Sequence, residues 1–181
     1  MFGEVFNGKN NGYFVDIGGA DSTSMSNTFL LEKRYHWRGI CLEANPFLFE
    51  NLRSMRSTTC LNACLDSKEG EVVFAQKDVI GGIVDNNTDN RPEKIGSQKA
   101  NVIRMQAKTL VSILIAENAP HTIDYLSIDV EGPEDRILRG FPFNKYRFNC
   151  LTIERPEADL REVLSRNGYI LIKDLPSMDA F

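Results

Sequence analysis

The sequence predicts an α/β fold in which a mostly parallel sheet is covered by helices on both faces. Two observations support this prediction. Short apolar runs alternate along the chain with longer amphipathic ones, a pattern that favours parallel strands joined by crossover helices. One run, Asp124–Val130, is apolar through most of its length, which is typical of a strand covered on both sides.

The expected elements follow in order from length, composition and boundary residues. Strands are predicted for the short runs rich in apolar and β-branched residues, namely Tyr13–Ile17, Gly39–Glu43, Thr59–Ala63, Glu71–Ala75, Val102–Gln106, Asp124–Val130, Phe148–Glu154 and Tyr169–Lys173. Helices are predicted for the longer amphipathic runs, namely Ser26–Tyr35, Pro46–Arg56, Leu110–Asn118, Glu134–Arg139 and Glu157–Asn167. Pro46 suits a first helical turn, and Gly168 stands where a helix would end.

One pair of strands has no helical pattern between its members. We therefore expect Glu71–Ala75 and Val102–Gln106 to form an antiparallel pair added at one edge of the sheet. The stretch between them, Asp78–Asn101, is polar, rich in turn residues and about twice as long as a routine connection. It is either a mobile surface loop or a lid that helps to select a substrate.

Composition places the chain among ordinary globular proteins. Its 181 residues, 42% apolar, are expected to form a single domain over residues 1–181. The net charge of −4 and the lack of a basic cluster argue against nucleic-acid binding. No apolar run approaches the roughly 20 residues of a membrane span, and the N-terminus lacks a signal-peptide pattern. We expect a cytoplasmic protein with four reduced cysteines and no membrane contact. The sequence leaves homo-oligomerisation open.

The stretch NGYFVDIGGADSTSMSNT, residues 11–28, predicts a ligand-binding loop after the first strand. Ligands of open parallel sheets bind at the carboxyl ends of strands, and Gly18 and Gly19 would let a ligand approach the backbone. The stretch is not a GxGxxG motif, and Asp16 and Asp21 bracket it, so a pyrophosphate would be repelled. These features favour S-adenosylmethionine, which has no phosphate but carries a sulfonium and an ammonium group.

Further candidate cofactor contacts come from the helix start and from the next strands. Backbone N–H groups near Ser26 and Asn27 could bind the cofactor's carboxylate. Glu43, which ends the second strand, could accept hydrogen bonds from both ribose hydroxyls. Asn62 and Ala63 would lie beside the adenine, although Asn62 also suits a plain turn at the end of a strand. Because a glycine loop and a ribose acid also suit NAD, an NAD-dependent oxidoreductase is the alternative.

Acidic residues are the candidates for catalysis. Both histidines lie in connections at the amino ends of strands, opposite the expected site. Asp129, Glu131 and Glu154 lie instead at carboxyl ends, where Asp129 is the preferred general base or anchor for a substrate hydroxyl. Alternatively, Asp129 caps the following turn and Glu131 is a first-turn helix acid. The three acids could also hold Mg²⁺ or Ca²⁺, but a divalent ion is not favoured and no residue is assigned as a metal ligand.

The chain resembles the FkbM-type methyltransferases, a branch of the S-adenosylmethionine-dependent Rossmann-like enzymes. The matching stretches are YFVDIGGADSTSMSNT, LEKRYHWRGICLEANP, LNACLDSKEGEVVF, LSIDVEGPEDRILRGF and GYILIKDLP. The resemblance implies a Rossmann-like three-layer α/β/α sandwich and methyl transfer to a hydroxyl oxygen of a sugar, a glycan or another small metabolite. The implied cofactor contacts are Asp16, Gly18, Asp21, Ser26, Asn27, Glu43 and the Asn62–Ala63 region. The neighbouring Gly19 and Ala44 complete the set of candidate cofactor-binding residues.

Three features depart from the family pattern. Ser22 and Pro133 stand where the family usually has Gly and His, respectively. Such folds normally finish with an antiparallel strand, but only DLPSMDAF follows Lys173, so we expect that strand to be short or missing. These departures leave a second alternative, a non-catalytic binding module that has kept the fold.

Overall fold

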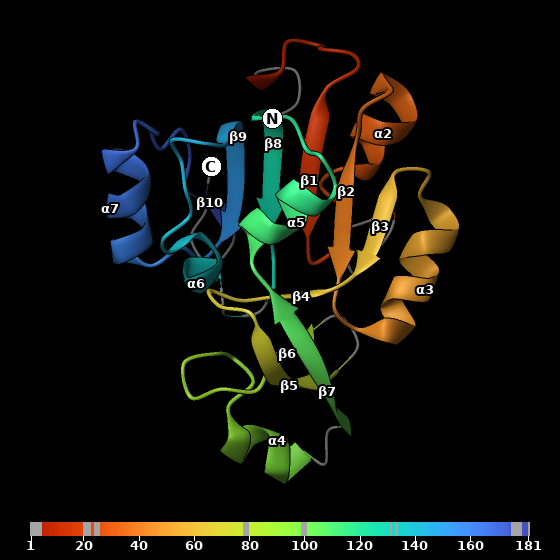
Figure 1. Ribbon diagram of the computed structural model, residues 1–181, viewed down its shortest axis with the longest axis vertical. Helices are drawn as coiled ribbons and strands as arrows, with labels where there is room; N and C mark the ends of the chain where they lie inside the picture. The colour runs from red at the N-terminus through yellow and green to blue at the C-terminus, as the bar shows by residue number, and fades with distance from the viewer. Residues whose placement is uncertain are drawn as a thin grey trace.

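The main sheet contains five parallel strands and one short antiparallel strand (Figure 1). The computed structural model describes residues 5–19, 23, 26–77, 80–98, 101–130, 132, 134–174 and 179–180. The strand order is β10-β9-β8-β1-β2-β3. The strands are β1 (Tyr13–Ile17), β2 (Arg38–Glu43), β3 (Thr59–Asn62), β8 (Thr122–Ile128), β9 (Arg147–Glu154) and β10 (Asp179–Ala180). The two-residue β10 pairs antiparallel with β9, which confirms the expected short last strand.

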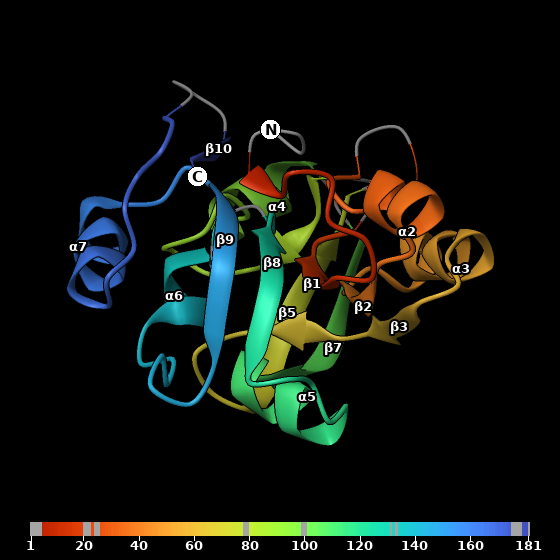
Figure 2. The same ribbon diagram turned by 90° about the horizontal axis from the view of Figure 1, so that it is seen from above.

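Helices cover both faces of this sheet, as the sequence predicts. They are α2 (Phe29–Tyr35), α3 (Pro46–Met55), α5 (Leu110–Ala116), α6 (Glu134–Leu138) and α7 (Ala158–Arg166). Figure 2 shows α2 and α3 beside the β2–β3 half of the sheet and α6 and α7 beside β9. None of the described helices is long and apolar enough to cross a membrane.

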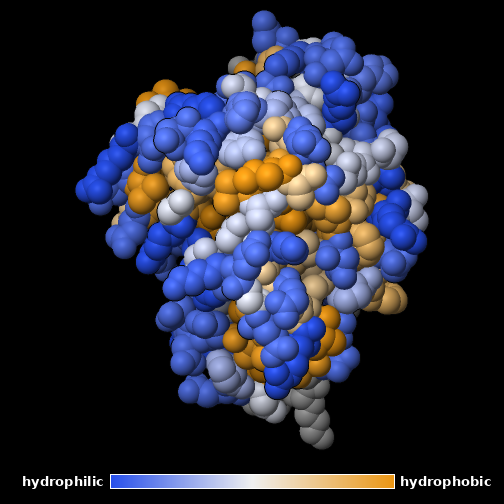
Figure 3. Space-filling view, in the orientation of Figure 1, coloured by the Kyte–Doolittle hydropathy of each residue, from blue (hydrophilic) through white to orange (hydrophobic). Residues whose placement is uncertain are grey.

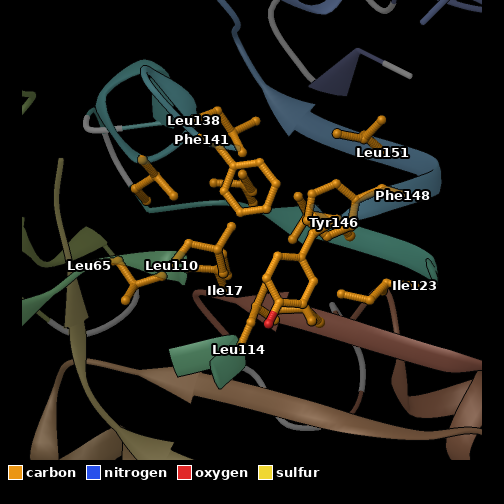
Figure 4. Close-up of a cluster of buried hydrophobic side chains, with 14 of the residues drawn as sticks. Ile17, Leu65, Leu110, Leu114, Ile123, Leu138, Phe141, Tyr146, Phe148 and Leu151 are labelled. Atoms are coloured by element: carbon orange, nitrogen blue, oxygen red, sulfur yellow. The ribbon is translucent and has the colours of Figure 1, made fainter. Parts of the chain in front are cut away.

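Alternate residues of the central strand β1 enter two separate apolar clusters. Val15 and Ile17 belong to the larger cluster, which includes residues of α5, α6 and α7 (Figure 4). Phe14 belongs to the smaller cluster, together with Leu31 of α2 and Leu52 of α3. Successive side chains of a strand point to opposite faces, so each face buries its own apolar layer. This arrangement is the three-layer α/β/α sandwich.

A second, smaller sheet extends from the carboxyl edge of the first. Its strands follow the order β4-β7-β5-β6, with β4 (Cys64–Leu65), β5 (Gly70–Gln76), β6 (Gly82–Ile83) and β7 (Asn101–Lys108). The antiparallel pairing of β5 with β7 is confirmed, but the pair lies in this second sheet and not at the edge of the main one. The reason is that only Ala63 separates β3 from β4, so the chain passes directly from one sheet into the other.

The polar stretch 78–101 is not the continuous loop that its composition predicts. It holds β6 and a helix, α4 (Pro92–Gln98). A Cβ atom at Gly81 would stand 2.7 Å from the carbonyl oxygen of Ala75, so glycine allows this segment to lie close to β5. In α4, Ile95 is buried, and this apolar contact anchors an otherwise polar segment. In Figure 3 apolar side chains form patches across the middle and lower part of one face, surrounded by hydrophilic residues.

The predicted strand Tyr169–Lys173 is wrong, because these residues lie outside any helix or strand. The Tyr169 hydroxyl accepts a hydrogen bond from the backbone N–H of Phe148 at 3.0 Å, a donor of β9 that a neighbouring strand would need. Arg147 stacks 4.2 Å from the Tyr169 ring and donates to the carbonyl oxygen of Asn167 at 2.5 Å. These contacts fix the chain beside β9 through side chains, without strand pairing.

The two neighbouring residues Leu114 and Ile115 of α5 test which face of the helix holds the fold together. Leu114 is fully buried in the larger cluster, whereas Ile115 is 63% exposed. We expect Leu114→Ala to lower the free energy of unfolding by about 2–5 kcal/mol, because it leaves a cavity in the core. The matched control Ile115→Ala should change it by less than about 0.5 kcal/mol. Urea denaturation measures both, and equal effects would contradict the assigned packing of α5.

Candidate functional site

The strand order of the main sheet reverses between β1 and β8. From β1 the chain builds outward through β2 and β3 and then returns to the other side of β1 as β8. Ligands of open parallel sheets bind at the carboxyl ends of the strands beside such a reversal. Ile17 is in register with residues of both neighbouring strands. The residues that end or follow these three strands therefore emerge at one edge, and they are Gly18, Glu43 and Asp129.

A cavity of about 50 Å³ lies at this edge. Five residues predicted from the sequence line it: Gly18, Glu43, Ala44, Ala63 and Asp129. The structure therefore brings together residues that are more than 100 positions apart in the chain, and it does so at the reversal of strand order.

Gly18 is required by the close approach of β1 to the end of β8. A Cβ atom at this position would stand 1.7 Å from the carbonyl oxygen of Asp129, and the residue has a φ of 87°. Its N–H donates to the carbonyl oxygen of Leu42 at 2.9 Å, and the N–H of Gly19 donates to the same oxygen at 3.2 Å. The start of the loop is thus fixed to β2 while it touches β8.

Glu43 is a buried carboxylate that faces the cavity. The residue is 5% exposed, and its Oε1 accepts a hydrogen bond from the backbone N–H of Asn45 at 2.7 Å. Burial raises the pKa of Glu43 to about 7, against the lowering effect of backbone hydrogen bonds from Asn45 and Ala44. A carboxylate held this way in a cavity can accept further hydrogen bonds from a hydroxylated ligand.

Asn62 holds the backbone at Glu43 and Ala44. Its side-chain amide donates to the backbone carbonyl oxygens of Glu43 at 2.8 Å and of Ala44 at 3.1 Å. Asn62 thus connects the end of β3 to the end of β2. The next residue, Ala63, lines the cavity.

Ser26 and Asn27 take part in hydrogen bonds within the protein. The Ser26 Oγ accepts from the backbone N–H groups of Thr28 at 3.2 Å and Phe29 at 3.1 Å, so it occupies two donors at the start of α2. The side-chain amide of Asn27 donates to the Ser127 Oγ of β8 at 3.0 Å. The predicted helix start at Ser26 is therefore too early, because Ser26 precedes the helix, which begins at Phe29 with Thr28 at its N-cap position.

Asp16 lies beneath the cavity, on the face of the sheet covered by α2 and α3. It is 4% exposed and accepts a short hydrogen bond from the Thr28 hydroxyl. Burial raises its pKa, although the bond from Thr28 and the nearby charge of Arg56 oppose this rise. Asp21, the second predicted acid of this loop, lies outside the described residues.

Of the three candidate catalytic acids, Asp129 lines the cavity and Glu154 lies in an ion pair at the end of β9. Asp129 is exposed and lines the cavity, and its N–H donates to the carbonyl oxygen of Ile17 at 3.0 Å. Glu154 ends β9 and forms an ion pair with Arg155, with 2.9 Å between Oε1 and Nε. Glu131 lies outside the described residues. The neighbouring Glu134 accepts from the N–H groups of Val130 at 3.3 Å and Gly132 at 3.1 Å, so it caps the loop after β8.

The second sheet contributes residues that the sequence analysis did not identify. Phe74 of β5 and Ile83 of β6 line the cavity together with Leu42 and Glu43 of β2. The segment after β6 also packs on the loop after β8, where a Cβ at Gly132 would stand 2.9 Å from the Cα of Thr88. No local pattern marks such residues, because their role depends on pairing between segments distant in sequence.

Arg56 is the other residue that the sequence analysis missed. It follows α3, and its fully buried side chain donates to Glu32 of α2 and to Thr28. Its position at the end of an amphipathic helix suggests an exposed charge, and nothing in the local sequence distinguishes it from Arg53, which is exposed.

Comparison with known families agrees with this geometry. The model of the methyltransferase FkbM domain matches residues 8–171, which include every described site residue above. The chain belongs to the FkbM methyltransferase domain family. No curated protein and no solved structure matches it.

Within this FkbM domain, the described residues contain no group of three or more His, Cys, Asp or Glu side chains placed to hold a metal ion. The four cysteines are free, with Cys41 and Cys64 buried and the other two half-buried. The polar and titratable residues that line the cavity are Glu43, Asn45, Cys64 and Asp129.

The raised pKa of Glu43 predicts a specific pH dependence of stability. The pKa is about 7 in the folded domain against an ordinary 4.5, so Glu43 favours folding most at acidic pH, and this contribution is lost as the pH rises through 7. We expect Glu43→Gln to raise the free energy of unfolding by about 1–3 kcal/mol at pH 8 and to change it little at pH 5. Urea denaturation at the two pH values measures the difference.

Glu32→Gln is the matched control, with the opposite sign. Burial disfavours the Glu32 carboxylate, but hydrogen bonds from Ser57 and Arg56 outweigh this effect and hold its pKa at about 2. Its contribution is present above pH 4.5 and is lost as the pH falls toward 2. Glu32→Gln should therefore destabilise the domain at pH 8. Destabilisation by both variants at pH 8 would contradict the assigned environment of Glu43.

Proposed function

We propose that this FkbM domain is an S-adenosylmethionine-dependent O-methyltransferase whose acceptor is a hydroxyl group of a sugar, a glycan or another small metabolite. The observation that supports the proposal most strongly is the buried Glu43 at the cavity beside the reversal of strand order. A buried carboxylate without a cationic partner in hydrogen-bonding contact is costly, and this cost is offset if a ligand donates hydrogen bonds to it.

The residues at the cavity fit an adenosyl group. Glu43 would accept hydrogen bonds from the ribose hydroxyls, and Phe74 and Ile83 would supply an apolar wall for the adenine. The cavity of about 50 Å³ is small beside the roughly 300–1,000 Å³ of most ligand sites. We therefore expect the mouth of the cavity to widen when the cofactor binds.

The acidic surroundings favour a cationic cofactor over a dinucleotide. Asp16 and Glu43 are both buried near the end of β1 and β2, where a pyrophosphate would be repelled. Two donors at the start of α2, the N–H groups of Thr28 and Phe29, are occupied by the Ser26 hydroxyl and are not available to a phosphate. These features support S-adenosylmethionine, whose sulfonium and ammonium groups are attracted to carboxylates.

In the proposed reaction, the protein positions the reactants and accepts a proton. When bound, S-adenosylmethionine supplies an activated methyl carbon for in-line displacement by the acceptor oxygen. Asp129, exposed at the carboxyl end of β8, would accept the proton of the acceptor hydroxyl. Glu154, which forms an ion pair with Arg155 at the next strand end, would orient the acceptor. Much of the rate enhancement would come from this positioning.

Ligand-induced thermal stabilisation tests the choice of cofactor. We expect S-adenosylhomocysteine to raise the melting temperature and NAD to leave it unchanged. At pH 8, where Glu43 is ionised, calorimetric titration of Glu43→Ala should show a loss of about 1.5–3 kcal/mol in S-adenosylhomocysteine binding. The control Glu50→Ala, an exposed acid of α3, should bind as the wild type does. Stabilisation by NAD alone would support an oxidoreductase instead.

Asp129→Asn tests the proposed base. We expect it to lower kcat by about 10²–10⁴-fold while the Kd for S-adenosylhomocysteine changes little, because the variant keeps the size of the side chain but cannot accept the proton. Methyl transfer to a panel of glycans and hydroxylated metabolites gives the rate, with Asp159→Asn on the exposed face of α7 as control. Full activity of Asp129→Asn would remove Asp129 from the mechanism. Cofactor binding without transfer to any acceptor would favour a non-catalytic module.

A further inference from the structure

One buried guanidinium connects three segments beneath the cavity. The Arg56 side chain is 0% exposed. Its Nε donates to Glu32 Oε2 at 2.5 Å, its Nη2 to Thr28 Oγ1 at 2.8 Å and its Nη1 to Ser26 Oγ at 3.2 Å. The same Nη1 lies 4.0 Å from Asp16 Oδ2. Arg56 thus links the end of α3 to α2, to the segment 26–28 and to β1.

The charges around Arg56 are unequal. Two buried carboxylates, Asp16 and Glu32, share this one guanidinium. Glu32 is the closer of the two, because it accepts a hydrogen bond directly from the guanidinium. Glu32 also accepts from the backbone N–H of Ser57 at 2.8 Å and forms an ion pair with the partly exposed Lys33 at 2.9 Å. Asp16 lies farther from the guanidinium, at 4.0 Å, and is also linked to it through the Thr28 hydroxyl, which receives a hydrogen bond from Arg56 and donates one to Asp16.

The position of this network points to its role. Asp16 precedes Ile17 and Gly18, both of which line the cavity. Glu43 ends the neighbouring strand β2 and lines the cavity itself. Within the proposed function, Glu43 accepts hydrogen bonds from the ribose hydroxyls of the cofactor. The ammonium of the cofactor's amino-acid part, placed near Asp16, would supply the positive charge that Arg56 only partly provides.

We propose that Arg56 is a positioning residue for the amino-acid part of the cofactor, and that it acts through Thr28 to hold Asp16 and the segment 26–28 in place. This inference rests on the proposed function. It separates the site into an adenosyl part at Glu43 and an amino-acid part at Asp16. A change in the Arg56 network should then affect only ligands that carry the amino-acid part.

Two probes distinguish the two parts. S-adenosylhomocysteine carries both, whereas 5′-methylthioadenosine keeps the adenosyl group and the sulfur but lacks the amino acid. Thr28→Val keeps the size of the buried side chain and the Arg56–Glu32 ion pair but removes the hydroxyl between Arg56 and Asp16. We expect it to weaken S-adenosylhomocysteine binding roughly tenfold or more, as for a lost charge-assisted hydrogen bond, and to leave 5′-methylthioadenosine binding unchanged.

Arg56→Lys is the second variant, because it keeps the charge but loses the planar fork that reaches Glu32, Thr28 and Ser26 together. It should show the same selective loss in calorimetric titrations. Arg53→Lys, on the exposed surface of α3, is the matched control and should bind both probes as the wild type does. If Arg56→Lys fails to fold, as judged by circular dichroism, the near-isosteric Thr28→Val provides the test by itself.

The outcomes separate this inference from the proposed function. If the wild type binds neither probe, the proposed function fails and the inference fails with it. If the wild type binds both probes but the variants weaken both equally, Arg56 has only a general structural role and the inference is overturned. Unchanged binding of S-adenosylhomocysteine to the variants overturns it too. A selective loss of S-adenosylhomocysteine binding supports it.

Discussion

The close approach of β1 to the end of β8 is the constraint on which the site depends. At Gly18 there is no space for a side chain, because the carbonyl oxygen of Asp129 occupies the place of a Cβ atom. The N–H of Gly18 also binds the carbonyl oxygen of Leu42, so one residue joins three strand ends. Glycine at this position therefore brings Glu43 and Asp129 to a single cavity, and any larger residue would separate them.

Three buried carboxylates show how the same chemical group serves stability or binding according to its partners. Glu32 accepts hydrogen bonds from Arg56 and Ser57, which hold its pKa at about 2 despite burial. Among the described residues, Glu43 has backbone donors but no cation in contact, and burial raises its pKa to about 7. Asp16 lies between these cases, since Arg56 reaches it through Thr28. The domain thus keeps ionised, paired acids in its framework and incompletely paired acids next to the cavity, where a ligand can complete them.

The second sheet gives the FkbM domain a wall that the main sheet alone lacks. Phe74 and Ile83 line the cavity, and the segment after β6 packs on the loop after β8. Arg155 extends this contact, since it pairs with Glu154 of β9 and with Asp89 of that segment. Residues between positions 80 and 90 therefore border both the cavity and the strand ends that carry the candidate catalytic acids.

The sequence by itself determined the strands and helices that build most of the main sheet, and it predicted the strand ends at which the candidate site lies. Apolar periodicity is a local property, so β1 was predicted with its observed bounds and Glu43 and Asp129 were expected at strand ends. Only the tertiary structure decided which distant residues meet. Arg56 and Arg53 look alike in sequence, but only Arg56 is buried, where it pairs with Glu32 of another helix. The apolar run 169–173 looks like a strand, but in the fold the Tyr169 hydroxyl takes the hydrogen bond of a β9 backbone N–H. Burial and hydrogen-bond partners set charge state and pairing, and neither is defined before the chain has folded.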